Sequence, residues 1–258
     1  MEDLKTELAI KAETAQGEVK LKSSMSITDM IKAMTPEIKK ALPSVLTVER
    51  FTRMAVSAMN NTPELAQCTP ISVLAALMNA AQLGLEPNTP LGQAYLIPYK
   101  NKGTYECQFQ IGYKGYIDLA YRNEQMQTIQ AQVVYENDQF DYELGLEPKL
   151  LHRPAYTDRG EMVFFYGLFR TVNGGYGFSV MAKPEMDAFA KKYSKAFASS
   201  YSPWKTSYED MAKKTVIKQA LKYAPIKTDL QKIVTLDESI KESLAIDMSE
   251  VPNEVVVA

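Results

Sequence analysis

The chain has 258 residues, a hydrophobic share of 46%, a charged share of 23% and a formal net charge of −2. These values are ordinary for a soluble globular protein, and the length allows one large domain or two small ones. The sequence has no apolar run near the roughly 18 residues of a membrane span, no apolar core of a signal peptide at its start, and no metal-ligand spacing of its two cysteines. We therefore expect a cytoplasmic protein with reduced thiols and no membrane partner.

The first part of the chain is predicted to be helical. Residues 1–24 are polar without sustained periodicity, so we expect a flexible N-terminal arm. Helical signals follow over residues 28–42, 48–59 and 71–83. The last helix has Thr69 as its candidate N-cap, Pro70 at its first position and Gly84 at its end. Its apolar residues cover nearly every face, which predicts a buried central helix.

The rest of the chain mixes strands with helices. Gln93–Lys100 and Tyr105–Ile111 alternate in polarity and predict a β-hairpin with a basic tip. The further predicted elements are a helix over 113–123, strands over 128–135, 161–172 and 176–183, and helices over 184–194 and 207–223. This order predicts an α+β fold, with a small antiparallel sheet and a projecting β-hairpin flanked by helices. Residues 25–232 are assigned to a single domain, and 233–258, with 6 acids against 1 base, to a flexible acidic tail.

Positive charge is concentrated in residues 183–232, which hold 11 Lys/Arg against 5 Asp/Glu, a surplus of +6. Aromatic residues lie between these lysines, and lysines for phosphates with rings for bases are typical of a single-strand nucleic-acid surface. Solvated helix faces and core aromatic residues would give the same pattern, so this alternative stays open. Lys214, Lys218 and Lys222 recur every fourth residue, which places them along one helix face next to Thr215. Since no Asp or Glu lies between Lys213 and Lys227, a bound anion is favoured.

Two other motifs suggest ligand contacts. The segment Leu85–Tyr99 predicts a rigid loop that leads into a projecting hairpin, although a loop shaped only for packing remains the alternative. In Gly112-Tyr113-Lys114-Gly115, glycines at a helix start would let backbone amides approach an anion, with Lys114 between them. A preceding strand argues against a KH-type loop here.

Catalytic motifs are poor. The single histidine, His152, is interpreted as a loop residue, and no Gly-x-x-x-x-Gly-Lys-Ser/Thr phosphate loop is present. The best enzymatic alternative is a magnesium-dependent nuclease, in which carboxylates hold the metal and a lysine assists. Its candidate residues are Asp138, Asp141, Glu143, Glu147 and Lys149. Gly145 and Pro148 predict a turn in this segment, whereas that chemistry normally rests on a rigid strand.

Three blocks of sequence carry a family resemblance. They are LGLEPNTPLGQAYLIPY at 83–99, FQIGYKGYIDLAYR at 109–122 and the block from Trp204 to Pro225. Together they resemble the RecT family of phage single-strand annealing proteins, which are recombinases that need no ATP, over about residues 25–230. We expect a close relative among Listeria prophages. Lys218 and Gln219 stand where many relatives have arginine, so bidentate phosphate geometry is lost at Lys218.

The resemblance implies binding of single-stranded DNA and of the annealed duplex, together with assembly into homo-oligomeric rings or filaments. It implies two protein partners, a phage exonuclease and the host single-strand-binding protein. It also places the basic block, including Lys213, Lys214, Thr215 and Lys218, in the DNA groove and the Tyr95–Phe109 hairpin beside the DNA.

We therefore predict that residues 25–232 bind and anneal DNA and oligomerise. The protein is expected to be no enzyme and to have no catalytic or metal site and no cofactor, with Mg²⁺ modulating annealing. The predicted nucleic-acid-binding residues are Gln93, Tyr95, Lys100, Lys102, Lys114, Lys183, Lys191, Trp204, Lys205, Lys213, Lys214, Thr215, Lys218 and Lys222. The alternatives are the magnesium-dependent nuclease and a phage structural protein whose basic face binds another protein.

Overall fold

The computed structural model describes residues 27–42, 44, 46–101, 103–194, 197–198, 200, 202–225, 237 and 240–241. The chain divides into two compact units. The first unit extends to Gly115 and includes Asp237, Ile240 and Lys241, and the second extends from Tyr116. The predicted arm at 1–24 and most of the predicted tail lie outside the described residues. The assignment of 25–232 to one domain stays a prediction.

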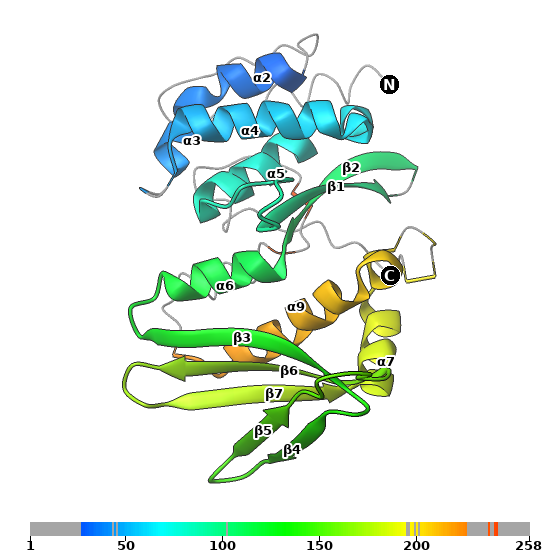
Figure 1. The fold of residues 1–258 in the computed structure, drawn as a ribbon. Helices are drawn as coiled ribbons and strands as arrows, with labels where there is room; N and C mark the ends of the chain where they lie inside the picture. Colours follow the sequence, from blue (N-terminus) through cyan, green and yellow to red (C-terminus); the bar gives the residue numbers. More distant parts are fainter. Residues whose placement is uncertain are drawn as a thin grey trace. The chain divides into compact units, whose positions relative to one another are not determined.

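The first unit is a helical layer with one β-hairpin (Figure 1). Its elements are α2 (Ile27–Ala33), α3 (Thr35–Ala41), α4 (Val48–Asn61), the 3-10 helix η1 (Pro63–Gln67), α5 (Pro70–Leu83), β1 (Ala94–Asn101) and β2 (Thr104–Ile111). Helix α5 is buried along nearly its whole length, as its apolar composition predicts, and Gly84 ends it in a left-handed conformation. Thr69 stands at the N-cap position, but its hydroxyl donates to Ser72 Oγ instead of capping the helix.

The two faces of the hairpin differ in character. Strands β1 and β2 pair antiparallel, with Tyr95 opposite Gln110 and Tyr99 opposite Glu106. The buried face carries Leu96, Cys107, Phe109 and Ile111. Ser72 Oγ in α5 accepts a hydrogen bond from the Cys107 amide at 2.8 Å, which attaches the hairpin to this helix. The other face carries Tyr95, Ile97, Tyr99, Glu106, Gln108 and Gln110.

Three residues of the predicted acidic tail belong to the first unit. Asp237, Ile240 and Lys241 are buried, and Asp237 Oδ1 accepts a hydrogen bond from the Ile111 amide at 2.7 Å. Burial lowers the pKa of Lys241. Asp237 is therefore attached to β2, while the assignment of 233–258 as a flexible tail stays a prediction.

The second unit has a three-stranded antiparallel sheet in the order β3-β6-β7, with helices on one face (Figure 1). Its elements are α6 (Tyr113–Tyr121, which begins in the first unit), β3 (Met126–Tyr135), β4 (Gln139–Glu143), β5 (Lys149–Arg153), β6 (Met162–Thr171), β7 (Tyr176–Ala182), α7 (Lys183–Tyr193), α8 (Pro203–Thr206) and α9 (Tyr208–Leu221). Helices and small antiparallel sheets confirm the predicted α+β class. None of the helices described is long and apolar enough to cross a membrane.

Helix α9 lies against the sheet because β6 has a glycine at the crossing point. A β-carbon at Gly167 would be 2.6 Å from the Val216 carbonyl oxygen and 2.9 Å from the Ile217 nitrogen. Only a residue without a side chain lets the two backbones approach so closely. The core beneath α9 consists of Val133, Phe165, Met181, Met186, Ala190, Trp204, Ala212 and Val216.

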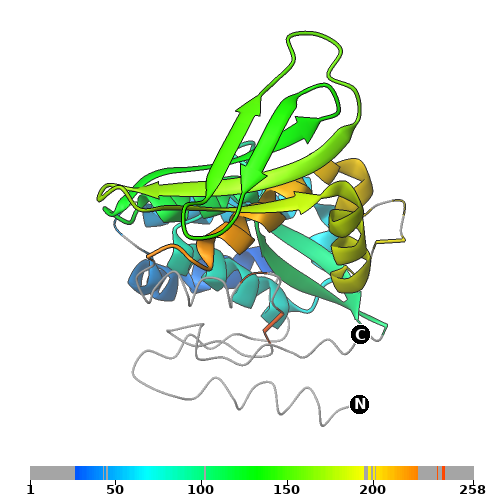
Figure 2. The ribbon, with the colours of Figure 1, turned by 90° about the horizontal axis from the view of Figure 1, so that it is seen from below.

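The opposite face of the sheet carries a second hairpin, β4–β5, which we call the arm (Gln139–Arg153). Figures 1 and 2 show the arm and α9 on opposite sides of the sheet. The Phe140 ring contacts Phe164 and Tyr166 of β6, with centroids 5.4 and 5.8 Å apart. These strands were not predicted, because the segment is polar and lacks the apolar alternation of the other strands. His152, predicted in a loop, lies in β5 with its side chain 6% exposed.

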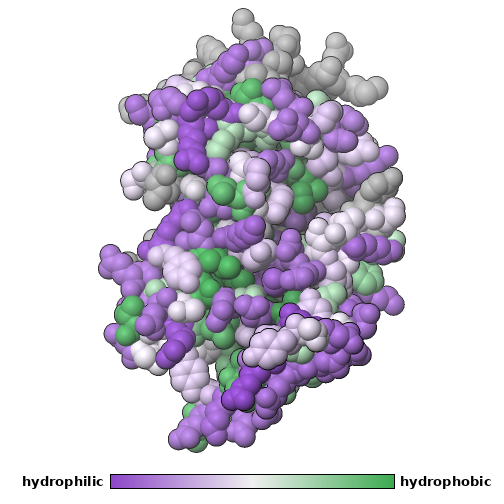
Figure 3. Space-filling view, viewed as in Figure 1, coloured by the Kyte–Doolittle hydropathy of each residue, from purple (hydrophilic) through white to green (hydrophobic). Residues whose placement is uncertain are grey.

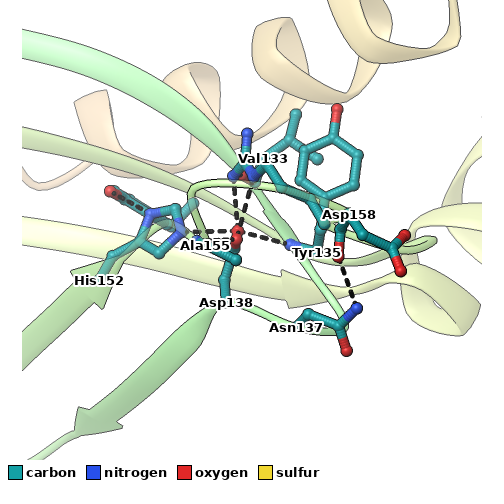
Figure 4. A network of polar contacts seen from close by, with 9 residues as sticks. Val133, Tyr135, Asn137, Asp138, His152, Ala155 and Asp158 are labelled. Atoms are coloured by element: carbon teal, nitrogen blue, oxygen red, sulfur yellow. Dashed lines mark hydrogen bonds and ion pairs between the residues drawn. The ribbon is translucent and has the colours of Figure 1, made fainter.

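A buried carboxylate fixes the base of the arm (Figure 4). Asp138 is fully buried and accepts hydrogen bonds from the Arg159 guanidinium, the His152 ring and the amides of Tyr135 and Ala155. The Arg159 guanidinium, helped by the two backbone amides and the His152 ring, holds the pKa of Asp138 well below its usual range, although burial by itself would raise it. The network joins the end of β3 to β5 and to the segment before β6.

Candidate nucleic-acid interface

Helix α9, the predicted basic helix, is more central than its sequence suggests. Four consecutive residues, Lys214 to Ile217, are buried. Because successive residues of a helix point about 100° apart, four in a row cover every side of α9. The helix is therefore enclosed along its middle and exposed only toward its ends.

The lysines of α9 do not form the evenly exposed row that their spacing predicts. Lys214 is only 4% exposed, Lys218 is partly buried with its ammonium 5.9 Å from the Tyr116 ring centroid, and Lys222 is exposed at the helix end. Lys213 forms an ion pair with Glu209, one helical turn before it. Its charge is therefore balanced by an acid that lies just before the acid-free stretch from Lys213 to Lys227. Helix α9 packs against β3, β6 and β7, which covers one side of it and explains part of this difference.

Two other predicted contacts are buried as well. Trp204 is 6% exposed and packs in the core of the second unit, edge-to-face with Tyr208. Its ring therefore cannot stack on a base in this conformation, which corrects the prediction. Thr215 donates its hydroxyl hydrogen to the Met211 carbonyl at 2.9 Å, so that donor is already used within the helix.

Lys183 takes part in a local network. Its ammonium lies 2.6 Å from Asp187 Oδ2 and 4.5 Å from the Tyr208 ring centroid. The Tyr208 hydroxyl donates to the other oxygen of Asp187 at 2.6 Å, and burial with this carboxylate raises the pKa of Tyr208. The charge of Lys183 is thus balanced at the start of α7.

Lys191 and Lys205 are exposed. Lys191 lies in the last turn of α7, and Lys205 donates from its ammonium to the Ala198 carbonyl at 3.2 Å. Among the described residues of the second unit, the predicted DNA-binding lysines with exposed side chains are Lys191, Lys205 and Lys222.

In the first unit, two motifs predicted separately come together. Tyr95, 40% exposed, and Lys114, also exposed, both lie against Gly92. A β-carbon at Gly92 would be 3.1 Å from the Tyr95 hydroxyl oxygen and 3.6 Å from Lys114 Cδ. Gln93 follows in the same loop, and its side-chain oxygen accepts from the Glu86 amide at 3.2 Å. We call Gly92, Gln93, Tyr95 and Lys114 the Gly92 cluster.

The glycines of the Gly112-Tyr113-Lys114-Gly115 motif serve this packing. A β-carbon at Gly112 would be 2.2 Å from the Gly92 carbonyl oxygen, and one at Gly115 would be 2.1 Å from the Gln93 carbonyl oxygen. The Gly112 amide donates to that same Gln93 oxygen at 2.9 Å. The motif therefore brings two segments into contact, and the Gly112 amide is not open to an anion as predicted.

The rest of the hairpin adds one exposed cation and several polar groups. Lys100 is exposed, with its ammonium 5.7 Å from the Tyr105 ring centroid, and Lys102 lies outside the described residues. On the face of Tyr95, the strands also carry Tyr99, Gln108 and Gln110, which the sequence reasoning did not select, together with Ile97 and the acid Glu106. For Gln108 and Gln110, the alternation with buried residues over Tyr105–Ile111 was the signal that could have identified them.

The carboxylates of the nuclease alternative are not gathered into one site. Asp138 is engaged with Arg159 and His152, while Glu143 pairs with Lys149 across the arm at 3.2 Å. Over the described parts of the chain, no group of three or more His, Cys, Asp or Glu side chains could hold a metal ion.

Comparison with known proteins gives one family. The RecT family matches residues 49–254. The chain is 39% identical over 222 residues to Protein RecT of Escherichia coli (strain K12), a match that covers 84% of this chain and 81% of that protein. It is also 29% identical over 226 residues to the uncharacterized protein YqaK of Bacillus subtilis (strain 168), covering 86% and 76% of the two chains.

Proposed function

The chain belongs to the RecT family, and from this premise we propose that it is an ATP-independent annealing protein of phage homologous recombination. Membership of this family supports single-stranded DNA binding, strand annealing and DNA recombination. In our proposal the protein acts as an oligomer in the bacterial cytoplasm, holds one strand along basic surfaces and pairs it with a complement.

The Gly92 cluster is the observation on which we base the binding mode. It combines one exposed ammonium, Lys114, with one partly exposed ring, Tyr95, against a closely packed backbone. A lysine can hold a phosphate while a ring stacks on a base, and neither contact reads the base edge. The Watson–Crick edges would then remain free for a second strand, so that base pairing alone selects the sequence.

The second unit would add phosphate contacts through its exposed lysines, Lys191, Lys205 and Lys222, and through the partly buried Lys218. Trp204, Lys214 and Thr215 are assigned a supporting role, because their side chains are buried. We therefore expect their replacement to lower stability before it changes DNA affinity. Lys183 and Lys213 can contact a phosphate only in competition with Asp187 and Glu209.

Equilibrium binding to a labelled single strand over a range of salt concentrations tests this proposal. Loss of one phosphate contact in Lys114→Ala should lower the slope of log K against log salt by about 0.7. Tyr95→Ala should leave the slope unchanged and weaken binding by about 1–3 kcal/mol, as expected for a lost stacking contact. Lys39→Ala, an exposed lysine of α3 away from the cluster, is the charge-matched control.

The proposed reaction breaks no covalent bond and uses no cofactor. ATP should therefore be dispensable, while Mg²⁺ should modulate annealing by screening the two strands from each other. We further propose that a phage exonuclease supplies the single strand and that the host single-strand-binding protein is a second partner.

The same preparation distinguishes the alternatives. With Mg²⁺, shortening of a labelled strand would indicate a nuclease, whereas faster pairing of complementary strands supports annealing. A protein that assembles but ignores oligonucleotides would instead be a structural protein.

A further inference from the structure

The tip of the arm exposes apolar side chains. Leu144 is 74% exposed and Leu146 is fully exposed, in the loop that joins β4 to β5. Figure 3 shows hydrophobic residues among hydrophilic ones at the lower end of the second unit, where Figure 1 places the arm. Two neighbouring leucines on a projecting loop offer apolar area that a contact with another molecule would bury.

The arm is held in place at its base and near its tip. The Asp138 network fixes the base, and the Tyr176 hydroxyl of β7 donates to the Pro148 carbonyl at 2.8 Å near the tip. The Phe140 ring packs on β6 between these two points. Because the arm is already ordered, binding at its tip costs little conformational entropy of the arm, which favours affinity.

The charges near the tip argue for a protein and against a nucleic acid. Glu143 pairs with Lys149, while the other two carboxylates of the arm are exposed, Glu147 directly after Leu146 and Asp141 within β4. Phosphates would be repelled by this surface, whereas a basic and apolar protein surface would be attracted.

A complementary surface is present on the same chain, at the end of α7. The Tyr193 ring is 63% exposed, the Lys192 ammonium lies 5.1 Å from its centroid, and Phe189 supports it at 4.6 Å. The arm tip offers carboxylates beside aliphatic side chains, and this surface offers an ammonium beside a ring. Leu144, Leu146 and Tyr193 are all exposed, so the arm tip does not cover the Tyr193 ring of its own chain.

We propose that the arm tip of one subunit docks on the end of α7 of the next copy of this chain. In this contact the two leucines cover the Tyr193 ring, and Glu147 pairs with Lys192. The two surfaces differ, so the contact is heterologous and generates a ring or a helical filament. The proposal rests on the assembly that forms part of the proposed function.

Sedimentation velocity of the full chain, alone and with an unlabelled single strand, tests this contact. Leu146→Ser, Glu147→Lys and Lys192→Glu should each weaken self-association by about tenfold or more. The double variant Glu147→Lys/Lys192→Glu restores opposite charges and should regain most of the loss. Two controls are matched to these changes. Tyr156→Ser removes a fully exposed ring outside the tip and should leave association unchanged, and Lys39→Glu should not rescue Glu147→Lys.

The proposal is overturned if the wild type sediments as a monomer under both conditions, if Leu146→Ser associates like the wild type, or if the double variant is no better than the single variants. Circular dichroism of each variant shows whether the fold is retained, which is expected because the altered side chains are exposed. Self-association is measured without strand pairing. A protein that assembles as predicted but does not anneal would therefore contradict only the proposed function.

Discussion

Replacement of Gly167 by alanine tests how α9, with its lysines, is positioned. The new β-carbon would lie 2.6 Å from the Val216 carbonyl oxygen, 2.7 Å from its carbon and 2.9 Å from the Ile217 nitrogen, whereas ordinary contact begins at 3.4 Å. All three atoms belong to the backbone, so α9 must move from β6 by about 0.8 Å, the difference between 3.4 and 2.6 Å. Overpacking of this kind costs about 1–3 kcal/mol.

Thermal unfolding followed by circular dichroism measures this effect. A loss of about 2 kcal/mol should lower the melting temperature by about 4–8 °C for a protein of this size. Ser179→Ala is the control, because Ser179 pairs with Gly167 on β7 and the change only removes a hydroxyl. A Gly167→Ala variant as stable as the wild type would show that α9 does not approach β6 so closely.

Three further predictions concern the polar network, the glycine packing and the thiols. In Asp138→Asn the charge opposite Arg159 is lost, and because solvent screens the partly exposed Arg159, stability should fall by about 1–3 kcal/mol at neutral pH. The folded-state pKa of Asp138 is depressed, so its contribution is complete above the ordinary carboxyl pKa of about 4 and is lost as pH falls below it. The melting temperatures of the two proteins should therefore converge in acid, and a constant gap would contradict the assigned network. Gly115→Ala should lower both the melting temperature and DNA affinity, since a β-carbon would strike the Gln93 carbonyl oxygen, and unchanged values of both would refute this packing. Burial raises the pKa of Cys68 to about 11 and that of Cys107 well above its usual value, so neither thiol should react with a thiol reagent at pH 8 until the protein unfolds. Rapid modification of the native protein would count against their burial.

Much of the fold was predictable because local patterns and burial agree. Helix α5 is apolar on all sides and is buried on all sides, and the alternation over Tyr105–Ile111 matches a strand with one buried face. The arm was not predictable in this way. Its strands are mostly exposed, and what orders them is the distant pairing of Asp138 with Arg159 and of Phe140 with β6.

The candidate site shows where sequence spacing is insufficient. Regular spacing placed Lys214, Lys218 and Lys222 on one face of α9, but their exposure depends on what packs around the helix. The ring of Trp204, which lies between lysines in the sequence, belongs to the core. Conversely, the contact of Gly92 with Gly112 joins segments that no local pattern connects, and it unites the predicted residues Tyr95 and Lys114.

Strand pairing is the central claim, and its rate is the most direct test. Two complementary oligonucleotides with a donor and an acceptor dye are mixed in a stopped-flow instrument without any nucleoside triphosphate. The wild-type protein should accelerate pairing well above the spontaneous rate, and the double variant Tyr95→Ala/Lys114→Ala should lose most of that acceleration while Lys39→Ala retains it. A wild-type rate equal to the spontaneous one would contradict annealing, and an unimpaired double variant would contradict the role of the Gly92 cluster.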